Sequence, residues 1–169
     1  MAKVELNQIC KSFGKARVVT DVDLSLEKGE FVVFVGPSGC GKSTLLRMLG
    51  GLERPSEGRV LQMGDAPEGC LNPLTYIFQD FALLPWRTVR DNVALGLELA
   101  DVPKRERLER AEAQLRLVGL ADWADRKVSE LSGGMQQRVG LARAFATEAP
   151  ILLMDEPFSA LDPLIRTRL

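Results

Sequence analysis

The sequence predicts an α/β fold of one domain, and three patterns carry that prediction. An apolar run at 31–35 is followed by the glycine-rich stretch 36–43 and then by helix-forming residues at 44–49. A second apolar run, 151–154, ends in two acidic residues. Between the two runs, apolar residues recur with a helical period over 88–120. We therefore expect two buried parallel strands with helices between them.

Shorter strands are predicted on both sides of the first apolar run. Apolar and polar residues alternate at 4–9 and 18–26, as they do in strands with one exposed face. A Pro-Ser-Glu-Gly turn at 55–58 leads into short strands at 59–63 and 75–78. The first part of the chain is therefore expected to be mainly β.

The later part of the chain is predicted to be mainly helical. Over 88–120 the apolar residues share one face, and the opposite face is charged, which is typical of a solvated surface. A further helix is expected at 136–147, directly after two glycines. Trp86 and Trp123 flank the longer region, and we interpret both as packing residues.

Composition limits the classes of function. With 22 basic and 23 acidic residues and no basic run, the 169-residue chain lacks the electrostatic footprint of nucleic-acid binding. No apolar run is long enough to span a bilayer, so a membrane role would come through a partner. The three cysteines lack C-x-x-C spacing and are interpreted as reduced thiols of a cytosolic protein. The absence of histidine excludes metal sites built on that residue.

The stretch 36–43 reads G-x-x-x-x-G-K-S and lies between a predicted strand and a predicted helix. Glycines in such a loop let successive backbone N–H groups point at one anion, and the following helix adds the positive end of its dipole. Lys42 would place its charge on the outer phosphates of a nucleotide, and the Ser43 hydroxyl would bind magnesium. The alternative is a plain turn from strand to helix, but lysine and serine at these offsets favour phosphate binding.

Other residues are candidates for the same site. Asp155 and Glu156 end the second apolar run, and their alternative interpretation is a charged turn. Because 36–43 also follows the carboxyl end of a strand, we expect it to share one crevice with these acids. The Ser-Gly-Gly stretch 132–134 precedes a helix and is a weaker candidate for anion binding. Phe13 is either a small core plug or a platform for a purine ring, and its spacing alone favours the plug.

Together these residues resemble the ATP-binding subunits of ABC transporters, and the resemblance runs along the whole chain. Residues 36–43 are similar to that family's Walker A loop, Gln79 to its Q-loop glutamine and 131–135 to its signature motif. Residues 151–156 resemble its Walker B strand, and 159–162 resemble its D-loop. Five motifs in the family's order make the resemblance specific.

The resemblance implies a role for each motif. Phe13 has the position of the aromatic that stacks on adenine, which reverses the preference for a core plug. The ATP phosphates are expected at Gly36, Pro37, Ser38, Gly39, Cys40, Gly41, Lys42, Ser43 and Thr44. The catalytic residues would be Glu156, which polarises the attacking water, and Gln79, and Mg²⁺ would be held by Ser43, Gln79 and Asp155. Ser132, Gly133 and Gly134 would contact ATP bound to a second ATP-binding subunit in a head-to-tail homodimer, with Asp162 in the D-loop.

A narrower resemblance, carried by 78–89 and 92–98, is to the importers for nitrate, sulfonate and taurine. It implies an ATPase that energises import of such a small anion through transmembrane permease subunits. A solute-binding protein would be an indirect partner, nucleic acid would not be a partner, and the subunit would lie on the cytoplasmic face of the membrane. The alternatives are a non-transport ABC ATPase that acts on nucleic acid or ribosomes, and an inactive truncated nucleotide-binding fragment.

The implied fold is a P-loop NTPase with a RecA-like core, an N-terminal antiparallel β subdomain and an inserted helical subdomain. The whole of 1–169 would be one partial ABC-type ATP-binding domain. Its parts would be a β subdomain at 1–30, a nucleotide-binding core at 31–80 and 147–169, and a helical subdomain with the signature motif at 81–146.

Two departures from the family pattern are visible. Met135 stands where the family usually has glutamine in its signature, and we expect a modest effect. The family also continues with another strand and a histidine that contacts the γ-phosphate, whereas this sequence has no histidine. Without that strand, 31–35 and 151–154 would leave backbone groups unpaired at about 1–3 kcal/mol each. We therefore expect a fold that is incomplete at its C-terminus and belongs to a longer subunit.

Overall fold

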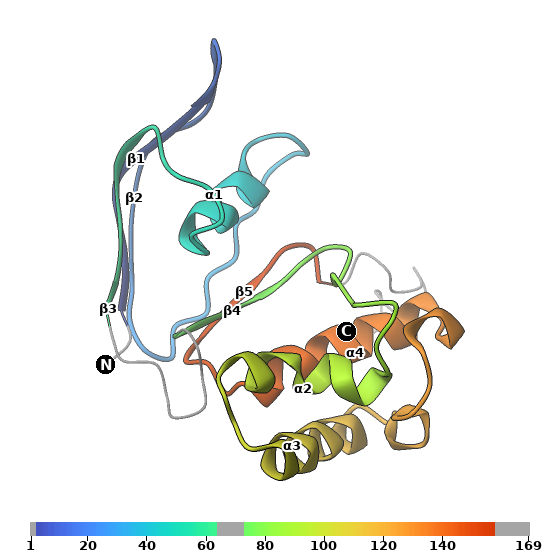
Figure 1. The fold of residues 1–169 in the computed structure, drawn as a ribbon. Coiled ribbons are helices and arrows are strands. Elements are labelled where there is room, and N and C mark those ends of the chain that lie inside the picture. The colour runs from blue at the N-terminus through green and yellow to red at the C-terminus, as the bar shows by residue number, and fades with distance from the viewer. Residues whose placement is uncertain (1–2, 64–72, 158–169) are drawn as a thin grey trace. The chain divides into compact units, whose positions relative to one another are not determined.

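The computed structural model describes residues 3–63 and 73–157 (Figure 1). The chain divides into two units, Met1–Asp65 and Ala66–Leu169. In the described residues, the first unit contains a three-stranded sheet and the second a two-stranded sheet. None of the helices in the described residues is both long and apolar enough to cross a bilayer.

The first unit is built on an antiparallel sheet with the strand order β2-β1-β3. Its strands are β1 (Lys3–Phe13), β2 (Ala16–Leu26) and β3 (Glu57–Met63). Phe13 pairs with Ala16 at the end of the β1–β2 hairpin, and the two-residue turn begins at Gly14 with a φ of 58°. Glycine adopts this left-handed conformation without the steric cost of a Cβ atom. The three strands predicted here are present, and each is longer than predicted.

The helix α1 (Lys42–Leu49) follows the glycine-rich loop in the same unit. Its buried residues recur at the spacing of one helical face, so α1 is amphipathic. The fully or nearly fully buried apolar side chains of this unit include Leu6, Ile9, Leu45, Met48 and Leu49. Burial of that face fixes the position of α1. Its N-terminus therefore lies directly after the glycine-rich loop.

The strand predicted at 31–35 is wrong. These residues form no strand, and Phe31 and Val35 are 86% and 90% exposed. A parallel strand buried on both faces needs neighbours that pair with its N–H and C=O groups. Within the described ranges, no strand pairs with this segment. A run of apolar residues indicates only a preference for burial, whereas a strand also requires a partner.

In the residues that the structure describes, the second unit combines a parallel strand pair with a group of helices (Figure 1). β4 (Leu74–Ile77) pairs with β5 (Ile151–Met154) in register from end to end. The helices are α2 (Val89–Leu99), α3 (Lys104–Leu117) and α4 (Gly133–Ala146), with the short 3₁₀ helices η1 (Ala121–Trp123) and η2 (Val128–Glu130). Because β4 and β5 are parallel, the residues that follow their carboxyl ends lie at the same edge of the sheet.

The helix α4 contributes to two apolar clusters of this unit. The larger cluster joins α2, α3 and α4 and includes Val93, Leu97, Ala111, Leu115, Val139 and Ala142. The smaller cluster contains Ala144 of α4, Ile77 at the end of β4, and Phe81 in the turn that follows β4. One helix therefore packs on its neighbouring helices and also on the strand pair.

Two sequence interpretations in this unit are corrected. The helical region predicted at 88–120 is two helices, α2 and α3, because Pro103 lacks the N–H that a continuous helix would need. Asp101 between them has a left-handed φ of 56°. Trp86 is 69% exposed, so its interpretation as a packing residue is wrong. Its place at the entry of the helical region suggested packing, but most of its surface is exposed in the described structure.

Candidate functional site

The glycine-rich loop 36–43 depends on glycine for its shape. Gly39 and Gly41 have φ values of 80° and 98°, which side chains rarely tolerate. A Cβ atom at Gly41 would lie 2.9 Å from the backbone oxygen of Val18 in β2. The loop thus packs closely on β2 just before α1 begins, and the two glycines make that path possible.

Lys42 lies at the start of α1 and curls back over the loop. Its Nζ atom donates hydrogen bonds to the backbone oxygens of Gly36, at 2.8 Å, and Pro37, at 2.9 Å. The N-terminus of α1 has no side-chain cap, so no capping oxygen occupies its first-turn N–H groups. An ammonium group beside an uncapped helix N-terminus attracts an anion, and the loop can therefore bind phosphate.

The other predicted loop residues surround these two features. Pro37 accepts a hydrogen bond from the backbone N–H of Cys40 at 3.3 Å, which closes a turn around Ser38. The thiol of Cys40 is free and exposed. Ser43 and Thr44 lie in the first turn of α1 and are partly exposed. The structure thus places the whole of 36–44 in one contiguous loop and helix start.

Phe13 lies at the tip of the β1–β2 hairpin and is 51% exposed. It is therefore a largely exposed surface ring rather than a core plug, and its stacking on adenine stays a prediction. Sequence reasoning missed its neighbour Lys11, whose Nζ atom lies 4.9 Å from the ring centroid. Two residues apart on one strand, the two side chains share a face of the sheet.

Lys11 is itself held in place. Its Nζ atom donates to Oε1 of Glu53 at 2.5 Å and to the backbone oxygen of Arg54 at 2.7 Å. The hydrogen bond from Lys11 lowers the pKa of Glu53 below its ordinary value. A cation fixed beside an aromatic ring interacts favourably with its π system.

In the second unit the predicted catalytic residues lie together. Gln79 follows β4 and Glu156 follows β5, and the Nε2 atom of Gln79 donates to Oε2 of Glu156 at 3.1 Å. Glu156 has a left-handed φ of 48°, an unfavourable conformation that is common at functional sites. Parallel pairing of two strands far apart in sequence brings these side chains into contact.

Asp155 is 6% exposed at the carboxyl end of β5. Its backbone N–H donates to the oxygen of Ile77 at 3.0 Å, which extends the pairing of β4 and β5. The hydroxyl of Tyr76 donates to Oδ2 of Asp155 at 3.3 Å, a contact that no sequence signal indicated. A buried carboxylate supported in this way keeps a fixed position at the strand end.

The predicted signature residues form the N-terminus of α4. Ser132 is the N-cap, and its Oγ atom accepts a hydrogen bond from the backbone N–H of Met135 at 3.4 Å. A Cβ atom at Gly133 or Gly134 would meet nothing within 4 Å. Among the residues that the structure describes, no contact therefore requires glycine at either position. The side chain of Met135 packs against the helical core, and the modest effect expected of it in place of glutamine stays a prediction.

Part of the predicted site stays a prediction. Asp162 of the predicted D-loop lies outside the described residues. Of the predicted magnesium ligands, Ser43 belongs to the first unit, and Gln79 and Asp155 belong to the second. The shared crevice for loop and acids and the complete ligand set are therefore predictions.

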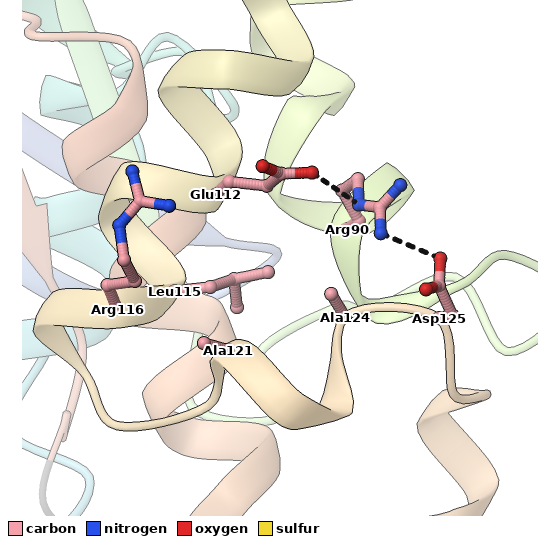
Figure 2. A pocket seen from close by; sticks show the side chains of 7 residues that line it. All are labelled: Arg90, Glu112, Leu115, Arg116, Ala121, Ala124 and Asp125. Carbon is pink, nitrogen blue, oxygen red and sulfur yellow. Dashed lines mark ion pairs between the residues drawn. The ribbon is translucent and has the colours of Figure 1, made fainter.

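A cavity of about 250 Å³ between α2, α3 and η1 contains none of these residues (Figure 2). Arg90 lines it and forms ion pairs with Glu112, at 3.3 Å, and Asp125, at 2.8 Å. The carboxylates of Glu112 and Asp125 both point toward the guanidinium of Arg90, as the dashed lines in Figure 2 show. The cavity belongs to the packing of the helices rather than to the predicted site.

Comparison with known proteins places the chain in a family. The sequence profile of the family described as "ABC transporter" matches residues 19–159. The taurine import ATP-binding protein TauB of Pseudomonas aeruginosa (strain UCBPP-PA14) is 49% identical over 100% of this chain and 66% of its own length. The Fe(3+) ions import ATP-binding protein FbpC of Rhizobium etli is 47% identical over 98% of this chain and 48% of its own length. The chain thus spans two thirds or less of these relatives.

A solved structure agrees with the sequence comparison. The ATP-binding cassette MJ0796, in a dimeric post-hydrolysis state bound to ADP and Pi, matches with a TM-score of 0.81 and 36% identity. The match covers 95% of this chain and 77% of the cassette. It confirms the predicted P-loop NTPase fold. The chain therefore belongs to the ATP-binding domains of the ABC transporter family.

Proposed function

We propose that the chain binds and hydrolyses ATP and thereby energises an importer. The observation that carries this proposal is the glycine loop 36–43, where Lys42 lies beside the uncapped N-terminus of α1. An anion that enters the loop offers Lys42 a stronger partner than the backbone oxygens of Gly36 and Pro37. The similarity to a cassette that binds ADP and Pi supports a nucleotide as that anion.

The purine would stack on the exposed ring of Phe13. Phe13 and the loop 36–43 belong to the same unit, so both proposed contacts of the nucleotide come from one part of the chain. Stacking on an aromatic ring is tolerant of base identity and contributes about 1–3 kcal/mol per base. The phosphates supply the charge that the loop recognises, and Phe13 adds preference for a base.

Hydrolysis would depend on Glu156 as the group that polarises the attacking water. Its carboxylate is held by the Gln79 amide, and such a contact fixes the direction in which the base faces. The oxygen atoms of Ser43, Gln79 and Asp155 are hard ligands that fit Mg²⁺, and bound magnesium would neutralise the charge of the outer phosphates. The buried, supported carboxylate of Asp155 suits that role.

The partners would be a second ATP-binding subunit and transmembrane permease subunits on the inner face of the membrane. Gly133 and Gly134 have open space where a Cβ atom would lie, so an outside group can approach the start of α4 closely. ATP bound to the second subunit of a head-to-tail homodimer would be that group, and the dimeric state of the MJ0796 cassette supports this arrangement. A solute-binding protein would act indirectly.

For the solute we propose a small anion such as taurine, another sulfonate or nitrate. The relative with 49% identity is named for taurine import, but one with 47% identity is named for Fe(3+) ions. Two relatives of similar identity thus serve solutes of very different chemistry. The stretch 78–89, which resembles the nitrate, sulfonate and taurine importers, favours the anion.

The Glu156→Gln variant of the protein at its full natural length tests the proposal. ATP binding should be retained, and turnover should fall by about 10²–10⁴-fold, the usual contribution of a general base. Glu148→Gln is a matched control, because Glu148 is exposed and its φ of 53° is left-handed like the 48° of Glu156. It should hydrolyse ATP normally. Turnover retained by Glu156→Gln would show that the base is misassigned, and wild-type protein that binds but never hydrolyses ATP would favour an inactive nucleotide-binding protein.

A further inference from the structure

The turn that follows Gln79 has a strained backbone. Phe81 and Ala82 have φ values of 58° and 41°, and neither is glycine. Left-handed conformations are unfavourable for residues with side chains, most of all for bulky ones, and they persist only where the surroundings impose them. The turn is therefore held in place by something outside itself.

Arg143 of α4 makes the contacts that hold it. Its Nη1 atom donates to the backbone oxygen of Ala82 at 2.8 Å, and its Nη2 atom donates to the backbone oxygen of Phe81. Burial of the guanidinium lowers the pKa of Arg143. Among the residues that the structure describes, no carboxylate pairs with Arg143. The guanidinium therefore has the backbone oxygens of Phe81 and Ala82 as its hydrogen-bond partners.

The same face of α4 makes two further contacts at the strand ends. A Cβ atom at Gly140 would lie only 3.2 Å from Cβ of Phe81, so glycine lets that ring pack directly on the helix. The Nε2 atom of buried Gln137 donates to the backbone oxygen of Pro157, the residue after Glu156. Positions 137, 140 and 143 are three residues apart and share one helical face.

We infer that Arg143 is a positioning residue that fixes where Gln79 presents its amide to Glu156. This inference rests on the proposed function. The planar fork of arginine spans two carbonyl groups at once, which lysine cannot do with its single ammonium group. The fork holds the strained turn two residues after Gln79, and Gln79 in turn contacts the catalytic carboxylate. The helix that carries Arg143 begins at Gly133, directly after its N-cap Ser132.

The test compares Arg143→Lys with Arg138→Lys in the protein at full natural length. Arg138 is a matched control, because it lies on the same helix and also donates to a backbone oxygen, that of Val118 at 3.0 Å, but is exposed. Turnover per ATP-binding site should fall by about tenfold to a hundredfold in Arg143→Lys, the usual cost of a small misplacement. The KM for ATP should stay within about twofold, because the proposed direct contacts with the nucleotide, Phe13 and 36–44, do not involve the turn. Arg138→Lys should match the wild type.

Hydrogen exchange provides a readout that does not need activity. Amide exchange at 81–83 should be faster in Arg143→Lys, with β4 and β5 unchanged. Gly140→Ala, which displaces Phe81, should lower turnover and speed exchange at 81–83, as Arg143→Lys does. It takes the place of Arg143→Lys if that variant does not fold. Normal turnover per site with faster exchange would overturn the positioning role, and unchanged exchange would overturn the inference that Arg143 holds the turn. A wild type without turnover would contradict the proposed function, while the exchange result still decides whether Arg143 holds the turn.

Discussion

Replacing Gly41 by alanine tests the shape of the phosphate loop most sharply. Gly41 has a φ of 98°, and a Cβ atom there would lie 2.9 Å from the backbone oxygen of Val18 and 3.2 Å from a methyl group of Val19. Gly39 has a comparable φ of 80°, but a Cβ atom at that position would meet nothing within 4 Å. The two substitutions therefore share the conformational strain and differ in the collision with β2.

The expected magnitudes follow from that difference. Conformational strain for alanine in a left-handed region costs about 1–2 kcal/mol, and this is the loss of unfolding free energy expected for Gly39→Ala. Gly41→Ala adds the displacement of the loop from β2, which at the typical cost of overpacking is about 1–3 kcal/mol. Its total loss should be about 2–5 kcal/mol, the sum of the two ranges.

Urea unfolding of both variants at full natural length measures the difference, with equal m-values as the check that unfolding exposes the same surface. ATP affinity should also fall more for Gly41→Ala, because the loop amides move with the backbone. Equal losses of stability in the two variants would refute the close packing of the loop on β2.

Two further predictions concern the other parts of the site. Gly134→Ala should raise the unfolding free energy by up to about 1 kcal/mol, because alanine favours a helix and meets open space, yet turnover should fall if a partner's nucleotide approaches there. Calorimetry and an ATPase assay separate the two effects, and unchanged turnover would argue against that approach. Because Lys11 lowers the pKa of Glu53, their ion pair should stabilise the protein above the ordinary glutamate pKa and lose this effect as the pH falls through the lowered value. Thermal midpoints of wild type and Lys11→Met should therefore differ at neutral pH and converge in acid, whereas a constant difference would contradict the ion pair.

Sequence reasoning succeeded where local pattern and chemistry coincide. The glycine spacing of 36–43 predicted a loop before a helix, and α1 begins at Lys42 within it. The apolar run Ile151–Met154 is a strand with the predicted bounds, because β4 supplies its partner. The run at 31–35 is also wholly apolar, yet the described residues offer it no partner strand. The composition of a segment indicates that it prefers burial. Whether it forms a strand depends on which other strand the fold places beside it.

The residues that support the site could not be found in this way. Arg143 contacts Ala82 and Phe81, which lie 61 and 62 residues earlier in the chain. The residues around Arg143 in the sequence indicate only a charged position on a helix. Lys11 likewise belongs to an alternating strand, where a lysine is ordinarily solvated. Only the tertiary structure shows that both cations donate hydrogen bonds to backbone oxygens. Long-range contacts of this kind leave no periodic signal.

A crystal structure of the full-length protein with Mg²⁺ and a non-hydrolysable ATP analogue tests the central claim most directly. The account predicts that the triphosphate lies against the backbone N–H groups of 36–44. The Nζ atom of Lys42 should leave the oxygens of Gly36 and Pro37 for the phosphate oxygens. A nucleotide bound elsewhere, or Lys42 still hydrogen-bonded to its own loop beside a bound triphosphate, would contradict it.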